Sequence, residues 1–177
     1  MSAPITHFHY CPRCGRVREK PGAEPVFKCT GCGFLYHFNP TIAVAGFLLD
    51  STHRILLIRR ANEPKKGKLA IPGGFVDFGE TAEEALRREI REEVNLTVGL
   101  LEYLCSQLNT YLYQEVTYPV LDFFFVARAE HVERAAALDG VESLFWSDPA
   151  AINADEIGFP SVRKGWEFFL AQRKRWF

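Results

Sequence analysis

The chain has 177 residues, a formal net charge of −1 and a sequence pI near 6.5. This length suits one good-sized domain plus a small module, and the near-neutral charge argues against a general nucleic-acid binder. No apolar run is as long as a membrane-spanning helix, and the first ten residues lack the basic start and apolar centre of a signal peptide. We therefore expect a soluble, cytoplasmic protein that has no membrane partner.

Two Cys-x-x-Cys pairs lie near the start of the chain. Cys11 and Cys14 form the first pair, Cys29 and Cys32 form the second, and a glycine follows each pair. Four thiolates satisfy tetrahedral Zn²⁺, and glycine allows the tight turn around the metal. The alternative is a disulfide framework, which a reducing cytoplasm disfavours. We predict a zinc ribbon over residues 1–38, with a structural role because four thiolates leave no open position for water.

The ribbon carries five lysines and arginines against two glutamates, a small local excess of positive charge. A module of roughly forty residues is too short to fold without a metal or a disulfide. We expect the ribbon to stabilise the protein or to support a homodimer. The fifth cysteine, Cys105, lies in a mixed apolar segment, and we expect it to be a buried small side chain.

Two strands are predicted after the ribbon, over residues 41–50 and 54–59, because β-branched residues and leucines are joined there across a short turn. A polar loop over residues 61–68 follows. Five basic residues are candidates to approach a phosphate-bearing substrate: Arg59, Arg60, Lys65, Lys66 and Lys68. Ordinary surface solubility is the more common explanation for such charges.

A double glycine, Gly73-Gly74, ends the next apolar stretch and predicts a strand end with a tight loop. Thr81 and Glu84 have the spacing of a capping box, so we expect a helix to begin there. Apolar side chains recur every four residues along this helix: Leu86, Ile90 and Val94. This periodicity predicts that one side of the helix packs against a core.

Three carboxylates share another side of this helix: Glu89, Glu92 and Glu93. At 100° per residue they lie within an arc of about 100°. Like charges at this spacing weaken a helix unless a cation neutralises them, and Mg²⁺ and Mn²⁺ prefer carboxylate oxygens. Acidic helices are usually solvated faces. The capped start, the apolar opposite side and the neighbouring glycine loop favour a metal site here.

Strands are expected beyond the helix at residues 96–104, 110–115, 118–129 and 143–146. Ser161 is expected to cap a last helix that runs toward Phe177. Its apolar side is formed by four residues: Val162, Trp166, Phe169 and Leu170. These elements alone predict a mixed α and β protein.

The segment between Gly74 and Leu96 resembles the Nudix box of the Nudix hydrolases. Eight residues fill that pattern in register: Gly74, Glu80, Arg88, Glu89, Ile90, Glu92, Glu93 and Leu96. Asn95 stands where the family has glycine, and asparagine is the next-best residue for a left-handed position after a helix. The resemblance implies a Nudix domain over residues 39–177, an α/β fold in which two helices enclose a mixed sheet as an α/β/α sandwich.

The same resemblance implies metal-dependent hydrolysis of a nucleoside diphosphate linked to another group. Glu89 and Glu93 would bind Mg²⁺ or Mn²⁺ directly, helped by a loop carbonyl near Gly73 or Gly74. Glu92 would be a further ligand or would hold a metal-bound water. Bound metal would offset charge on the pyrophosphate and lower the pKa of the attacking water.

Two further roles follow from the resemblance. Arg88 and Glu80 would brace the loop against the helix. The family often takes its general base from a downstream glutamate, and Glu142 occupies such a place before a late strand. Glu142 is therefore a candidate base or third metal ligand, and an exposed strand-edge glutamate is the other explanation.

A zinc ribbon followed by a Nudix domain is similar to the NADH pyrophosphatase branch and related ribbon–Nudix proteins, over essentially the whole chain. That branch carries a Ser-Gln-Pro-Trp-Pro-Phe-Pro-x-Ser array, of which this chain has only Ser106-Gln107. Strict NADH specificity is therefore in doubt, and substrates of the NAD(H), ADP-ribose or FAD type stay open. Tyr111 and Tyr113 are candidates to stack on a base, or else they belong to the core.

Three functions remain open at this point. The first is a pyrophosphohydrolase acting on a small nucleotide conjugate. The second is an RNA 5′-end hydrolase or RNA-binding module whose ribbon holds the transcript. The third is a non-catalytic nucleotide sensor. The intact set of carboxylates favours the first over the third, because a protein that only binds need not retain groups that activate water.

Overall fold

The structure is a computed structural model that describes residues 2–18 and 25–176. The chain divides into two compact units. The first unit contains Met1–Thr41 and Thr110–Val120, and the second contains Ile42–Asn109 and Leu121–Phe177. The part of the predicted ribbon at residues 19–24, and the predicted end of the last helix at Phe177, lie outside the described residues.

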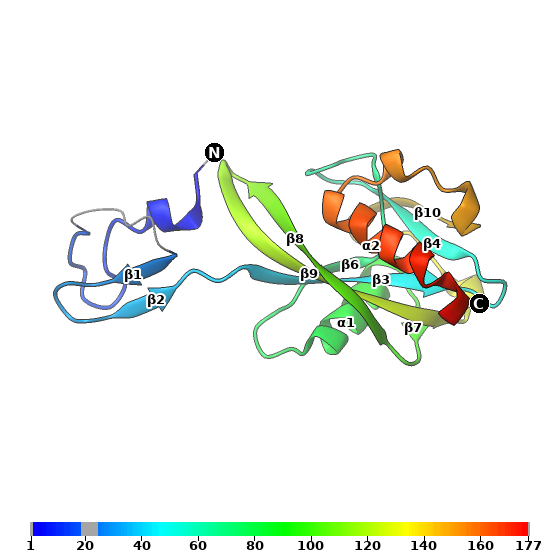
Figure 1. Ribbon diagram of the computed structural model, residues 1–177, viewed down its shortest axis with the longest axis horizontal. Coiled ribbons are helices and arrows are strands. Elements are labelled where there is room, and N and C mark those ends of the chain that lie inside the picture. The colour runs from blue at the N-terminus through cyan, green and yellow to red at the C-terminus, as the bar shows by residue number, and fades with distance from the viewer. Residues whose placement is uncertain (1, 19–24, 177) are drawn as a thin grey trace. The chain divides into compact units, whose positions relative to one another are not determined.

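The first unit is built around a two-stranded antiparallel sheet (Figure 1), in which β1 (Val26–Lys28) pairs with β2 (Leu35–His37). Its small core combines cysteines with aromatic rings: Cys11, Phe27 and Cys29 are buried, and Phe8, Cys32, Phe34 and Phe38 pack against them. So few apolar residues bury little surface, and a metal would therefore add much of the stability of such a unit.

The tip of a long hairpin completes the first unit. The hairpin is formed by β8 (Glu102–Tyr113) and β9 (Val116–Glu130). At its tip, the Ser2 N–H donates to the Glu115 carbonyl at 3.4 Å, and the Thr117 N–H donates to the Ser2 carbonyl at 2.9 Å. The ribbon and residues 110–120 therefore belong to one unit, although they are far apart in the sequence.

The second unit contains an eight-stranded sheet with the central order β10-β4-β3-β9-β7, in which β5 pairs with β4, β6 with β3 and β8 with β9. The strands not yet given are β3 (Thr41–Leu49), β4 (Ile55–Arg60), β5 (Leu69–Ala70), β6 (Gly73–Phe75), β7 (Thr97–Val98) and β10 (Val141–Ser147). β4 is buried over its first four residues, which suits a strand at the centre of a sheet covered on both faces.

Two helices enclose this sheet (Figure 1): α1 (Ala82–Val94) and α2 (Pro160–Ala171). The core on the α1 side contains Leu48, Leu56, Leu86, Ile90 and Phe125, among other residues. The core on the α2 side contains Phe47, Leu57, Phe124, Trp166 and Phe169, among other residues. Neighbouring residues on the strands thus face opposite helices, as the pleat requires. The predicted α/β/α sandwich with a mixed sheet is confirmed.

Both ends of α1 follow from its sequence. The Thr81 hydroxyl accepts the Glu84 N–H at 3.2 Å, and Glu84 Oε2 accepts the Thr81 N–H at 2.9 Å. The predicted capping box is therefore confirmed. Asn95 ends the helix with a φ of 55°, in the left-handed conformation expected of it.

Three expectations about elements were wrong in detail. Ser161 does not cap the last helix, because α2 begins at Pro160, which takes the first helical position where its missing N–H costs nothing. The strand expected over residues 96–104 is two strands, β7 and the start of β8. The strand expected over residues 110–115 is the end of β8 followed by the hairpin turn at 114–115.

Short 3₁₀ helices connect the other elements: Pro4–His7, Val132–Arg134, Pro149–Ala151, Ala154–Glu156 and Arg173–Arg175. No helix in the described part of the chain combines the length and the apolar character needed to cross a membrane.

The turn between β3 and β4 is organised by the buried carboxylate of Asp50. Its Oδ1 accepts the backbone N–H groups of Thr52 at 2.8 Å and Arg54 at 2.9 Å, and its Oδ2 accepts Arg54 Nε at 2.7 Å. Burial raises the pKa of Asp50, but these hydrogen bonds outweigh it, so that the pKa lies below its ordinary value. The charged form therefore stabilises the folded state.

We expect Asp50→Asn to lower the free energy of unfolding by about 2 kcal/mol at pH 7, because an amide oxygen is a weaker acceptor than a carboxylate. The pKa of Asp50 is lower in the folded protein than in the unfolded chain, where it is about 4. This stabilisation is therefore fully present above the unfolded-state pKa and is lost as the pH falls through the folded-state pKa of Asp50. Urea unfolding at pH 7 and at pH 3 measures the difference. Asp155→Asn, at an exposed acid, is the control and should change stability by less than about 0.5 kcal/mol.

Candidate active site

The glycine loop and α1 are brought together by strand pairing. β6 pairs antiparallel with β3, so that Gly73 lies opposite Ala45 and Gly74 opposite Val44. A Cβ on Gly73 would lie 2.1 Å from the Val44 carbonyl oxygen, and Gly73 has a φ of +151°. Both the space and the backbone conformation therefore require glycine.

The backbone of this loop lies directly on two carboxylates of α1. The Gly73 N–H donates to Glu93 Oε2 at 2.9 Å. A Cβ on Gly74 would lie 2.3 Å from Glu89 Oε1, so a side chain at position 74 would displace that carboxylate. The structure thus brings together four residues that the sequence singled out: Gly73, Gly74, Glu89 and Glu93.

Both carboxyls are poorly solvated, and their pKa values reflect it. Burial raises the pKa of Glu93 to about 8, against the hydrogen bond from Gly73. Burial also raises the pKa of Glu89, against the hydrogen bond from Arg88. A buried carboxylate needs a compensating charge, and a divalent cation that binds oxygen would provide one. The donor set therefore fits Mg²⁺ or Mn²⁺.

Arg88 connects the loop before α1 with the acidic side of the helix. Its Nε and one terminal nitrogen donate to the two Glu80 oxygens at 2.8 and 3.0 Å. That same terminal nitrogen donates to the Phe75 carbonyl at 3.1 Å. The other terminal nitrogen donates to Glu89 at 2.9 Å and to Glu92 at 3.1 Å. Arg88 and Glu80 thus have the contacts expected of a brace between loop and helix.

Glu92 and Glu142 are less enclosed than Glu89 and Glu93. The Glu92 side chain is 52% exposed and pairs with Arg88. Glu142 is exposed on β10 at a β-bulge, where the register with β4 shifts between Val141 and Ser143. Among the described residues, no hydrogen bond or ion pair joins Glu142 to the glutamates of α1. Its role as a base stays a prediction.

Two further charged residues act on Glu93 electrostatically: Arg60, which the sequence had marked only as a possible phosphate contact, lowers its pKa, and Asp139, which sequence reasoning missed, raises it. Arg60 ends β4. Asp139 lies on a loop whose backbone N–H groups donate to the last carbonyls of α1, from Ala136 to Val94 at 3.1 Å and from Leu138 to Glu93 at 2.9 Å. Only this tertiary contact brings Asp139 to the site, and the sequence gives no local sign of it.

Of the basic residues predicted to approach a phosphate, Arg59 lies on β4 and Lys68 lies in the loop at residues 61–68. Arg59 donates to the Gly67 carbonyl at 2.6 Å and lies 3.9 Å from a Glu156 oxygen, so it anchors the loop. Lys68 is exposed. Tyr111 is partly buried and Tyr113 is exposed, and both belong to the first unit, whereas α1 belongs to the second. Their role in stacking on a base stays a prediction.

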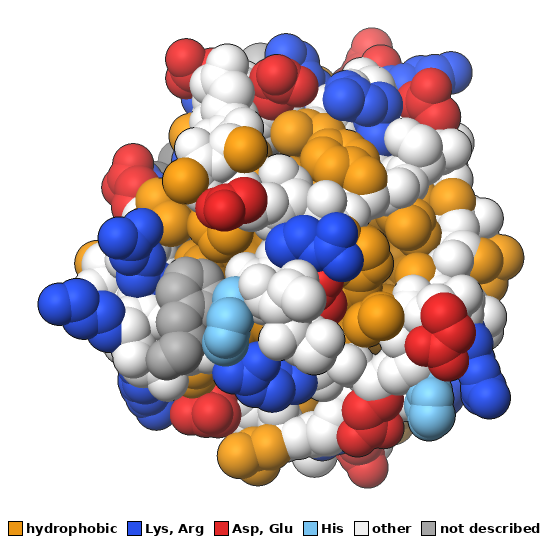
Figure 2. Space-filling view, turned by 90° about the vertical axis from the view of Figure 1, so that its right-hand side faces the viewer, with side chains coloured by type: hydrophobic (Ala, Val, Ile, Leu, Met, Phe, Trp, Pro, Cys, Tyr) orange, Lys and Arg blue, Asp and Glu red, His pale blue; other side chains and the backbone are white. Residues whose placement is uncertain are grey.

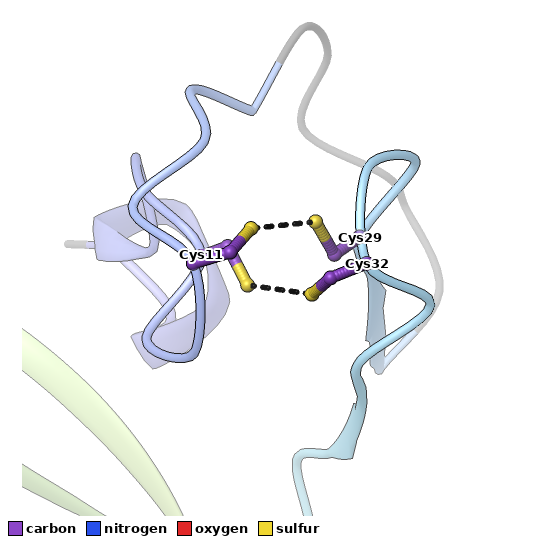
Figure 3. A group of neighbouring side chains, drawn as sticks. Cys11, Cys29 and Cys32 are labelled. Carbon is purple, nitrogen blue, oxygen red and sulfur yellow. Dashed lines mark hydrogen bonds between the residues drawn. The ribbon is translucent and has the colours of Figure 1, made fainter.

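The four cysteines of the ribbon form a compact cluster (Figure 3). All four sulfurs lie within 4.8 Å of one another, with 3.7 Å between Cys11 and Cys32 and 3.6 Å between Cys14 and Cys29. All four are free thiols. Tetrahedral Zn²⁺ with bonds near 2.3 Å places its sulfurs about 3.8 Å apart, whereas a disulfide needs about 2.05 Å. The cluster therefore fits zinc.

The backbone of each knuckle supports the same arrangement. The Gly15 N–H donates to the Cys11 carbonyl at 2.9 Å, and the Gly33 N–H donates to the Cys29 carbonyl at 3.1 Å. Both glycines have a φ of 72°. Hydrogen bonds from the backbone N–H groups of Cys32 and Gly31 lower the pKa of Cys29. The pKa of Cys14, by contrast, is raised to about 12, since a hydrogen bond from the Arg16 backbone is outweighed by contacts with Cys32 and by burial. The fit to zinc therefore rests on the positions of the four sulfurs.

Comparison with known proteins identifies the family of this chain and several relatives of it. The family model described as the NUDIX domain matches residues 39–164. An ADP-ribose pyrophosphatase from Methanocaldococcus jannaschii is 47% identical over 75 residues, which cover 42% of this chain and 41% of that protein. An NAD-capped RNA hydrolase, NudC, from Haemophilus influenzae is 34% identical over 111 residues, which cover 58% of this chain and 41% of that protein.

The chain thus matches about two fifths of the length of these curated relatives. Among solved structures, a NUDIX hydrolase from Nitrosomonas europaea superposes with a TM-score of 0.72 at 22% identity, covering 94% of this chain and 92% of that one. At this identity the likeness concerns the fold alone.

We expect Gly73→Ala to lower the free energy of unfolding by on the order of 3 kcal/mol or more, because the new Cβ would overlap the Val44 carbonyl. Gly99→Ala is the matched control, since its Cβ would meet only a Glu130 oxygen at 3.5 Å, and it should change stability by less than about 1 kcal/mol. Urea unfolding followed by tryptophan fluorescence compares them. Equal stability of the two variants would show that β3 and β6 do not approach so closely.

For the cysteine cluster, we expect about one zinc ion per chain in the purified protein. Cys29→Ser should lose that zinc and lower the melting temperature, because the first unit has few other apolar contacts. Cys105→Ala, outside the cluster, should keep the zinc. Elemental analysis and thermal unfolding before and after chelation measure both properties. A Cys29→Ser protein with full zinc content and unchanged melting would contradict the assignment.

Proposed function

Because this chain belongs to the Nudix family, we propose that it is a metal-dependent pyrophosphohydrolase. Its substrate is a nucleoside diphosphate linked to a second group, of the ADP-ribose, NAD(H) or FAD type, and hydrolysis yields two monophosphates. The observation that carries this proposal is the enclosure of Glu89 and Glu93 by the backbone of the glycine loop.

In this proposal Glu89 and Glu93 hold Mg²⁺ or Mn²⁺, and Glu92 is a further ligand or holds water. Such an ion, once bound, offsets negative charge on the pyrophosphate and lowers the pKa of water. Arg88 keeps Glu89 and Glu92 oriented through its hydrogen bonds, and Glu80 holds Arg88 in turn. Two partly buried carboxyls, one of them held by the Arg88 guanidinium, thus form a site that is ordered before substrate arrives.

The substrate class is supported by the relatives. One is named an ADP-ribose pyrophosphatase and another an NAD-capped RNA hydrolase, and both names describe a nucleotide joined to a second group. This chain has Ser106-Gln107 without the rest of the array of the NADH branch. We therefore place ADP-ribose and related conjugates ahead of NADH as candidates.

We further propose that the four cysteines hold a structural Zn²⁺ within a ribbon at residues 1–38, ahead of the Nudix domain at 39–177. Thiolate ligands need a reducing compartment to stay free of disulfides, which supports a cytoplasmic protein. The ribbon would stabilise the chain or support a homodimer.

We expect Glu93→Gln to lower kcat by at least about 100-fold while the protein stays folded, because the amide cannot provide the ligand charge. Glu83→Gln is the matched control, since Glu83 is exposed in the first turn of the same helix, and it should keep full activity. EDTA should abolish turnover, and added Mg²⁺ or Mn²⁺ should restore it. Full activity of Glu93→Gln would contradict the assigned role.

The substrate itself is found by a screen of ADP-ribose, NAD⁺, NADH, FAD and a short NAD-capped RNA, each with Mg²⁺ and with Mn²⁺. Product analysis in ¹⁸O-water then locates the phosphorus that is attacked. Turnover of nucleoside triphosphates alone would contradict the substrate class, and a complete absence of turnover would favour a nucleotide sensor.

A further inference from the structure

The second unit contains a buried carboxyl group that the proposed mechanism does not use. Asp122, on β9, is 6% exposed, and no lysine, arginine or histidine among the described residues forms an ion pair with it. Charges elsewhere lie at the surface: on the face that carries the C-terminal end of α2, Figure 2 shows basic side chains (blue) interspersed with acidic ones (red). A buried charge costs free energy unless it is paired or hydrogen-bonded, so Asp122 requires an explanation.

Asp122 lies under the first turn of α2. A Cβ on Gly165 would lie 3.1 Å from the Phe124 ring, so α2 packs closely on β9 at that point. Ser161 is one helical turn before Gly165, and Asp122 is two residues before Phe124 on the same face of the strand. The Ser161 and Asp122 side chains therefore meet where α2 begins.

The polar side chains beside the Asp122 carboxyl do not fully satisfy it. Burial raises its pKa, and the nearby Ser161 and Asn109 side chains offset that effect only in part. Ser161 is 1% exposed, and its hydroxyl has no partner at hydrogen-bond distance among the described residues. The charged form of Asp122 would therefore gain from a further hydrogen-bond donor.

The cover that α2 gives to the sheet ends beside Asp122. The helix begins at Pro160. Ala45 on β3 packs against the core on the α2 side but is only partly buried, and Asn109 on β8 is partly buried as well. The small side chain of Ala45 leaves room above the sheet. A flat ligand on this part of the sheet would reach Asp122 from the side that α2 leaves open.

Strand pairing relates Asp122 to the glycine loop. β3 and β9 are neighbours that run in the same direction (Figure 1). The Phe47 and Phe124 rings are in contact, with 6.0 Å between their centroids. Ala45 and Asp122 are each two residues earlier on these strands, so they lie side by side. Because Ala45 also pairs with Gly73, Asp122 is two strand spacings, about 10 Å, from the glycine loop.

Arg60 relates the start of α2 to the glutamates. Its guanidinium carbon lies 5.2 Å from the centre of the Phe159 ring, immediately before α2. Its charge also lowers the pKa of Glu93. The start of α2 and the carboxylate site are therefore near each other. A nucleotide conjugate whose pyrophosphate lies at Glu93 would have its base within reach of Asp122.

From this arrangement we propose that Asp122 recognises the 6-amino group of adenine, the base of the proposed substrates. This inference rests on the proposed function, because it takes the pyrophosphate to be bound at Glu89 and Glu93. An ionised carboxylate only accepts hydrogen bonds, so it favours a base that presents an N–H donor. Adenine presents its 6-amino group. Hypoxanthine has a 6-oxo group instead, an acceptor that would face the carboxylate oxygens.

Hydrolysis of the best adenine conjugate from the substrate screen, and of its hypoxanthine counterpart, tests the proposal with the full-length, zinc-loaded protein. We expect kcat/KM to be at least about tenfold higher for the adenine conjugate, because the 6-oxo group leaves a buried acceptor unpaired. Asp122→Asn introduces an amide that donates to a 6-oxo group, so the preference should fall below about threefold. Glu130→Gln, at an exposed acid on the same strand, is the matched control and should keep the full preference.

Calorimetric titration of the wild-type protein with AMP and with IMP separates this inference from the proposed function, because neither nucleotide has an anhydride bond to cleave. AMP should bind at least about tenfold more tightly than IMP, even if no conjugate is turned over. This comparison does not depend on the folding of any variant. Absence of AMP binding, equal affinity for the two nucleotides, faster turnover of a guanine conjugate, or equal base preference in Asp122→Asn and Glu130→Gln would each overturn the inference. Failure of EDTA to abolish turnover would count against the proposed function alone.

Discussion

The close approach of the Gly73–Gly74 backbone to Glu89 and Glu93 is the constraint on which the rest of the site depends. Pairing of β6 with β3 brings the loop so near to the neighbouring strand that position 73 has no room for a Cβ. The same approach removes water from two carboxyls and raises the pKa of each. The fold thus maintains an arrangement that is unfavourable for isolated carboxylates and favourable once a divalent cation lies among them.

Arg88 and the two ends of α1 make this arrangement stable. The guanidinium offsets part of the charge on Glu89 and Glu92 and ties both to Glu80. The N-terminus of the helix is satisfied by its capping box, and carbonyls of its last turn accept N–H groups from the loop before β10. A helix with both ends hydrogen-bonded and one side buried has little freedom to rotate. The carboxylates therefore keep their orientation toward the glycine loop.

Local features of the fold could be predicted from the sequence, because they depend on neighbouring residues. The capping box at Thr81, the left-handed Asn95 and the buried side of α1 follow from spacing alone. Contacts between distant segments could not be predicted in this way. Asp139 and Arg60 reach Glu93 only through the packing of β4 and the loop before β10. The cap expected at Ser161 failed because Pro160, one residue earlier, already provides a preorganised first turn.

The hairpin of β8 and β9 gives the molecule an unusual modular structure, since its tip belongs to the unit of the ribbon and its base to the other unit. A terminal module is commonly gained or lost in evolution by joining or cutting the chain at one point. Here a single cut near residue 40 would leave the hairpin tip without the backbone hydrogen bonds to Ser2. Removal of the ribbon would therefore expose to water the Glu115 carbonyl and the Thr117 N–H, which Ser2 now pairs.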